Sequence, residues 1–87
     1  MCVNDQMKRL IVYARRECHL CKEMIDSLRS IQENHPFELE IIDIDLDHNL
    51  IKLYNERVPV LFVPDEGREL CHHHLDLSLV SHYLAGN

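Results

Sequence analysis

The sequence is poor in the residues that mark flexible or low-complexity chains, since its 87 residues include only two glycines, three prolines and no tryptophan. Basic residues are also in deficit. Nine Lys and Arg stand against 15 Asp and Glu, which gives a formal net charge of -6. Phosphate binding needs basic side chains gathered on one face, so this balance argues against a nucleic-acid partner.

Long apolar runs are missing as well. No stretch approaches the ~20 apolar residues that cross a bilayer, and residues 1–7 are polar rather than arranged as a secretion signal. We therefore expect a cytoplasmic monomer that does not bind membranes. A hydrophobic fraction of 46% is enough for one modest core, which predicts a flexible lead-in over residues 1–7 and a single domain over residues 8–87. Cys2 falls in the lead-in and is interpreted as incidental.

Apolar patterning predicts alternating strands and helices. The expected elements are a strand over residues 10–13 buried on both faces, a helix from 18 to about 33, a strand over 37–46, a short helix carrying 50–54, strands over 60–63 and 68–71, and a final helix over 77–84. A connecting helix makes the first two strands parallel, whereas the turn at 64–67 makes the last two antiparallel. The predicted fold class is therefore α/β.

Four residues are expected to mark the ends of these helices. Asp45 or Asp47 can cap the short helix, and Asp76 can cap the last one. Gly86 suits the left-handed position that often follows the C-terminus of a helix.

Reactive chemistry is concentrated in the motif Cys18-His19-Leu20-Cys21, where the first strand leads into the first helix. Free backbone N–H groups and the positive end of the helix dipole stabilise a thiolate at such a position. We therefore assign Cys18 as the nucleophile. Cys21 follows one turn later, at a separation compatible with a disulfide, and is assigned as the resolving thiol. His19, Arg15 and Arg16 can add positive charge beside Cys18, whereas Glu17 acts in the opposite direction.

Val58-Pro59, directly before the strand over 60–63, is a second signal. A cis peptide bond here would hold a tight turn against the thiols. The backbone of Val58 would then be free to pair with an incoming peptide or with glutathione.

With these motifs in place, the sequence resembles the glutaredoxin-like branch of the thioredoxin superfamily, particularly its small bacterial members. The resemblance spans residues 10–84 and rests on Tyr13-Ala14-Arg15, the motif at 18–21, Val58-Pro59-Val60-Leu61, and the final hairpin and helix. It implies a thioredoxin-like fold with a four-stranded mixed sheet flanked by three helices, a cis Pro59, and dithiol-disulfide exchange by an oxidoreductase.

The resemblance also implies a ligand. Arg15 matches the basic residue that contacts a glutathione carboxylate, and Asp76 could match the acidic residue that receives the glutathione amino group. The Gly-Gly pair that follows the last strand in many glutaredoxins is replaced by residues 71–74, which counts against glutathione. His19 and Leu20 likewise stand in place of the usual Pro and aromatic residue. The resemblance implies no tightly bound cofactor, with glutathione as co-substrate or a thioredoxin-type reductase as electron donor.

Two other interpretations stay open. Cys18 and Cys21 could join Cys71 or a histidine to hold zinc without turnover. Adjacent residues point in different directions, however, so the run His72–His74 is expected to be solvated rather than to form a metal site, with Cys71 as a core thiol. Alternatively, the chain could be an adaptor whose thiols act as a regulatory switch.

Overall fold

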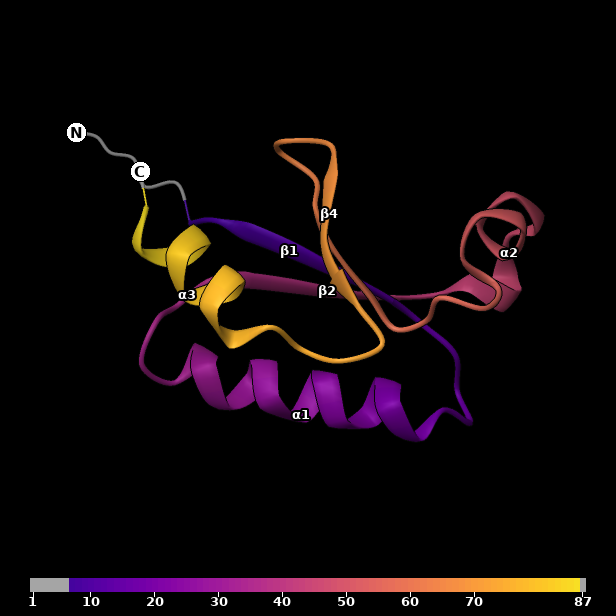
Figure 1. Ribbon diagram of the computed structural model, residues 1–87, viewed down its shortest axis with the longest axis horizontal. Helices are drawn as coiled ribbons and strands as arrows, with labels where there is room; N and C mark the ends of the chain where they lie inside the picture. The colour runs from indigo at the N-terminus through magenta and orange to yellow at the C-terminus, as the bar shows by residue number, and fades with distance from the viewer. Residues whose placement is uncertain (1–6, 87) are drawn as a thin grey trace.

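A computed structural model describes residues 7–86 of the chain (Figure 1). The described part contains β1 (Arg9–Ala14), α1 (His19–Gln32), β2 (Glu38–Asp43), a 3₁₀ turn η1 (Ile44–Leu46), α2 (His48–Tyr54), β3 (Val60–Val63), β4 (Arg68–His72) and α3 (Leu77–Ala85). Apart from Met7, the expected lead-in lies outside the described residues, and so does Cys2.

The four strands form one mixed sheet in the order β2-β1-β3-β4. β1 pairs in parallel with β2, which follows the α1 crossover, and β3 pairs antiparallel with both β1 and β4. The α/β class, the parallel first pair and the final hairpin are thus confirmed. Gly67 closes the hairpin turn with a φ of 63°, a left-handed conformation that glycine adopts without steric cost.

The core lies between one face of the sheet and the helices α1 and α3; in Figure 1, α1 lies beneath the sheet and α3 lies at its left end. Its buried members come from β1, β3, β4, both helices and the loop before β2: Leu10, Val12, Ala14, Cys21, Met24, Leu28, Phe37, Leu61, Val63, Leu70, Val80 and Tyr83. Burial of these apolar side chains is what fixes α1, and with it the cysteine motif, against the sheet.

The opposite face of the sheet is only partly covered, so the expectation that the first strand is buried on both faces is wrong. Ile11 and Tyr13 are half-buried there. Tyr13 stacks on Tyr54 of α2 with ring centroids 4.6 Å apart and meets the edge of Phe62 at 5.8 Å. Figure 1 shows α2 beyond the end of the sheet rather than across it, which explains the incomplete cover.

Local capping accounts for the other departures from the sequence prediction. The second strand ends at Asp43 because the carboxylate of Asp43 accepts the backbone N–H of Asp45 at 2.9 Å and starts η1. Asp47, rather than Asp45, caps α2 by accepting from Asn49 N at 2.8 Å. Gly86 is extended, with a φ of -72°, so the left-handed end expected for the last helix is wrong.

Candidate active site at the start of α1

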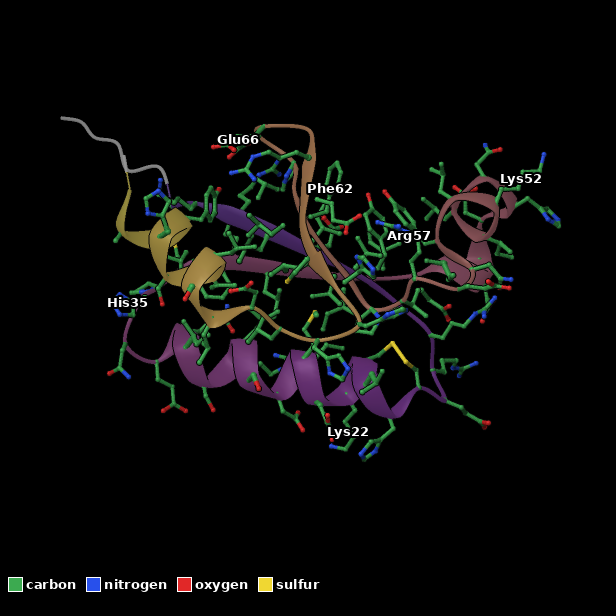
Figure 2. All side chains as sticks on the ribbon, in the orientation of Figure 1. Lys22, His35, Lys52, Arg57, Phe62 and Glu66 are labelled. Atoms are coloured by element: carbon green, nitrogen blue, oxygen red, sulfur yellow. A yellow bond between two sulfur atoms is a disulfide. The ribbon has the colours of Figure 1, made fainter. Side chains whose placement is uncertain are left out.

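Cys18 and Cys21 lie at the N-terminus of α1, as the motif predicts. Cys18 is the N-cap residue in an extended conformation, and its Sγ accepts the backbone N–H of Cys21 at 3.2 Å. The two sulfurs form a disulfide, visible as the yellow bond in Figure 2, with Cα atoms 5.2 Å apart. The first turn of α1 carries no acidic residue, so no carboxylate of that turn offsets the positive end of the helix dipole.

The two cysteines differ in accessibility. Cys21 is 1% exposed and packs in the core with Met24 and Leu28, whereas Cys18 is half-buried at its edge. A large disulfide substrate can therefore reach the sulfur of Cys18 more readily than that of Cys21. An attacking and a resolving thiol require this difference.

The Val58–Pro59 peptide bond is cis, as expected. Pro59 is fully buried and leads into β3, whose Val60 pairs with Tyr13 at the end of β1. This register brings the Val58–Pro59 segment to the end of the sheet from which the loop to α1 departs (Figure 1). The carbonyl of Pro59 accepts the backbone N–H of His73 at 2.8 Å, so that oxygen already has a partner.

The structure gives Arg15 internal partners on two other elements. Its Nε donates to Asp45 Oδ1 at 3.1 Å, and its two Nη atoms donate to the side-chain and backbone oxygens of Asn55 at 2.6 and 3.3 Å. The guanidinium thereby fastens η1 and the end of α2 to the loop before Cys18.

The other two charged residues expected to contact substrate are also engaged. The ring of His19 is exposed and pairs with Glu23 at 2.8 Å on the surface of α1. Asp76 caps α3, accepting the backbone N–H of Leu79 at 3.1 Å. The structure thus gathers Cys18, Cys21, Arg15 and the Val58–Pro59 turn at one end of the sheet.

The first two of the three consecutive histidines have different hydrogen-bonding partners, although their rings meet edge to face with centroids 4.8 Å apart. His72 Nδ1 lies 2.7 Å from Glu69 Oε2, whereas His73 Nε2 lies 2.9 Å from the backbone oxygen of Glu56. His73 has a φ of 66°, a conformation uncommon outside glycine, at the loop where many glutaredoxins carry Gly-Gly. The backbone N–H of His73 donates to the Pro59 carbonyl, and its ring contacts the Glu56 carbonyl. Both contacts hold this loop against residues 56–59. Among residues 7–86, no group of three or more His, Cys, Asp or Glu side chains is placed to hold a metal ion.

Glu69 on β4 contacts His72 of the same strand and Arg57 of the segment before β3. Burial works to raise the pKa of Glu69, but hydrogen bonds and positive charge from His72 and Arg57 outweigh it and hold the pKa below its usual range. A lowered folded-state pKa contributes stability above the unfolded-state value and loses it as pH falls through the folded-state pKa.

We therefore expect Glu69→Gln to reduce the free energy of unfolding at pH 5 by up to about 1 kcal/mol, as for other partly exposed ion pairs. The difference from wild type should shrink as the pH falls through the lowered pKa of Glu69, where the carboxylate protonates. Urea titrations at pH 5 and pH 3 measure it. If Glu69→Gln lowers the free energy of unfolding equally at pH 5 and pH 3, lost packing rather than lost charge is the cause.

Cys71 is a half-buried thiol on β4, outside the disulfide. Burial raises its pKa, and the hydrogen bond from the Asp76 backbone only partly opposes that effect. Because the thiolate is the reactive form, we expect slow alkylation of Cys71 at neutral pH. With Cys18 and Cys21 oxidised and Cys2→Ser in place, iodoacetamide should modify it several-fold more slowly than free cysteine. The same protein unfolded in urea should react at the rate of free cysteine. Equal rates in the folded and unfolded protein would contradict the slowing of Cys71 by burial.

A cleft of about 310 Å³ lies on the β2 side of the cysteine pair, away from the Val58–Pro59 turn. It is lined by Ala14, Arg15, Arg16, Cys18, Cys21, Lys22, Ile25, Ile41 and Asp43. Of the residues expected to contact substrate, only Arg15 lines it. The basic residues before and within the motif region were the only signal of this cleft in the sequence, because only the folded chain brings Ile25 of α1 and Ile41 of β2 to the same cleft.

None of the described helices is long and apolar enough to cross a membrane. The family model described as "Glutaredoxin-like domain (DUF836)" matches residues 9–85. A search of curated proteins gives no match.

Solved structures resemble the chain over most of its length. Protein Ne2328 from Nitrosomonas europaea, solved by solution NMR, is 49% identical with a TM-score of 0.85, covering 98% of this chain and 100% of its own. Protein XcR50 from X. campestris, solved by X-ray diffraction, is 33% identical with a TM-score of 0.70, covering 86% and 93%. A malarial protein at 13% identity and a TM-score of 0.66, covering 92% and 100%, shares the fold.

Proposed function

The chain belongs to the glutaredoxin-like domain family, and on that premise we propose that it is a thiol-disulfide oxidoreductase whose nucleophile is Cys18. The observation that carries the proposal is the position of Cys18 as N-cap of α1, where its sulfur accepts the backbone N–H of Cys21. This hydrogen bond and the helix dipole favour the thiolate over the thiol.

The reaction follows from the unequal burial of the two thiols. The Cys18 thiolate attacks one sulfur of a substrate disulfide, and the other sulfur leaves as a thiolate that takes up a proton. Cys21 then gives up its proton and attacks the Cys18 sulfur, which expels the remaining substrate thiolate and closes the Cys18–Cys21 disulfide. Two electrons have passed to the substrate, and two external thiols return the pair to its reduced form.

We propose protein disulfides as substrates, with glutathione or a thioredoxin-type reductase as the electron donor in a reducing, cytoplasmic setting. The internal contacts of the expected glutathione ligands support this preference. Arg15 is engaged by Asp45 and Asn55, and Asp76 caps α3. Glutathione would have to displace these contacts to bind as the resemblance implies.

Intact-protein mass across glutathione redox buffers, with metal content measured on the same sample, tests the function. We expect a reversible loss of two hydrogens that follows a two-electron curve, and a glutathione adduct when Cys21 is replaced by serine. Thiols that stay reduced in every buffer would contradict the proposal. Equimolar zinc surviving dialysis would favour a zinc-binding module.

A further inference from the structure

We propose that the cleft between α1 and β2 binds the polypeptide of a protein substrate beside its reacting cysteine, and that it selects a segment carrying an apolar side chain and a carboxylate. The inference rests on the proposed function and extends it from a reaction to a class of substrate.

Position is the first argument. Both Cys18 and Cys21 line the cleft, so a segment bound there lies next to the sulfur that would join it in the mixed disulfide. The cleft is bounded by the end of β2, an edge strand of the sheet, and is open to solvent rather than enclosed. A polypeptide that continues in both directions can therefore enter it.

Charge is the second argument. Three cations and one carboxylate, Asp43, line the cleft, although the whole chain carries a net charge of -6. Arg15 is paired with Asp45, and Lys22 projects outward from α1 in Figure 2, where it pairs with Asp26 at 3.2 Å. Arg16 is exposed and forms no ion pair with any residue between 7 and 86. It is the cation available to meet a carboxylate of the substrate.

The apolar floor is the third argument. Ala14, Ile25 and Ile41 lie beneath the charged rim, and Ile41 keeps 40% of its surface exposed although it lies on the same face of the sheet as buried Val12, its pairing partner. An apolar side chain would remove this surface from water. The volume is near the lower limit of about 300 Å³ for ligand sites, which suits one or two side chains. Glutathione has no apolar side chain, so it would leave the floor exposed.

The test uses second-order rate constants of the reduced protein with four disulfides of thionitrobenzoate. The partners are a Cys-Leu-Glu peptide, a Cys-Ser-Lys peptide, glutathione and 2-mercaptoethanol. Attack of the Cys18 thiolate on the partner's sulfur releases coloured thionitrobenzoate in each case. Wild type is compared with Arg16→Glu and Ile41→Ser, and with Arg29→Glu as a matched charge control in the last turn of α1.

We expect wild type to react about three- to ten-fold faster with the Leu-Glu peptide than with the Ser-Lys peptide, the range typical of exposed charge pairs together with modest apolar contact. Arg16→Glu should reverse the charge preference, Ile41→Ser should weaken the apolar one, and Arg29→Glu should change neither. The mercaptoethanol disulfide reaches neither the apolar floor nor the charged rim, so its rate normalises each protein for the intrinsic reactivity of Cys18, and only Arg29→Glu is expected to match wild type with it.

Equal rates for the two peptides, or a preference that Arg16→Glu leaves unchanged, would overturn the proposed substrate class while leaving the oxidoreductase intact. A faster reaction with the glutathione disulfide that Arg16→Glu slows would assign the cleft to glutathione instead. If wild type attacks none of the four disulfides, the proposed function itself is wrong.

Discussion

Replacing Cys18 with serine should abolish mixed-disulfide formation, whereas replacing Cys21 with serine should leave the first step intact and trap its product. A hydroxyl at position 18 cannot form a disulfide bond, so we expect the rate of disulfide exchange to fall at least about a thousand-fold, as when other enzymes lose their nucleophile. In the Cys21→Ser protein, the buried hydroxyl cannot attack the Cys18 sulfur, and the adduct persists.

Intact mass after incubation with a disulfide substrate measures both outcomes. Cys18→Ser should show the unmodified mass, and Cys21→Ser should show one substrate adduct that dithiothreitol removes. Cys71→Ser is the matched control, because it removes a thiol outside the pair and should cycle as wild type does. If Cys18→Ser still cycles, the nucleophile is another cysteine and the roles assigned from the helix N-terminus are wrong.

The location of the cysteine pair could be predicted because it depends on local chemistry. A β-branched run, a cysteine at the junction and apolar residues at helical spacing specify the strand, the cap and α1 within a short stretch of chain. The cap of α3 at Asp76 was predictable for the same reason, since a carboxylate before an apolar run satisfies free N–H groups two or three residues later.

Long-range contacts could not be predicted in this way. Arg15 was expected to face a ligand, yet its partners Asp45 and Asn55 lie 30 and 40 residues further along the chain. Nothing in the spacing of residues near Arg15 indicates them. The incomplete cover over Tyr13 has the same origin, because an apolar side chain in a strand does not reveal which helix will pack on it.

These long-range contacts surround the reactive pair. Arg15 holds η1 and α2 beside the loop before Cys18, and His73 holds the segment before Pro59. The contacts of Arg15 and those of His73 lie on opposite sides of β1, at the end of the sheet that carries the cysteine pair. The resemblance assigns Arg15 to glutathione, and the engagement of Arg15 within the chain supports the proposal that protein disulfides are the substrates.

The packing that positions the pair predicts the second large effect. Leu28 is fully buried on the face of α1 that carries Cys21 and Met24, at the centre of the contact with the sheet. Leu28→Ala should lower the free energy of unfolding by about 2 to 5 kcal/mol, through lost burial and a residual cavity. A domain of this size has a total of roughly 4 to 13 kcal/mol, so the variant should be marginal at 37 °C.

Urea unfolding of the oxidised proteins, followed by circular dichroism, measures this loss as a lower midpoint with an unchanged slope. Ser27→Ala is the matched control on the exposed side of α1 and should stay within about 0.5 kcal/mol of wild type. Leu28 lies ten residues from Cys18, about 15 Å along the helix, so disulfide exchange per folded molecule at low temperature should be unchanged. If exchange slowed while stability was retained, Leu28 would act on the geometry of the N-terminus of α1 rather than on the stability of the fold.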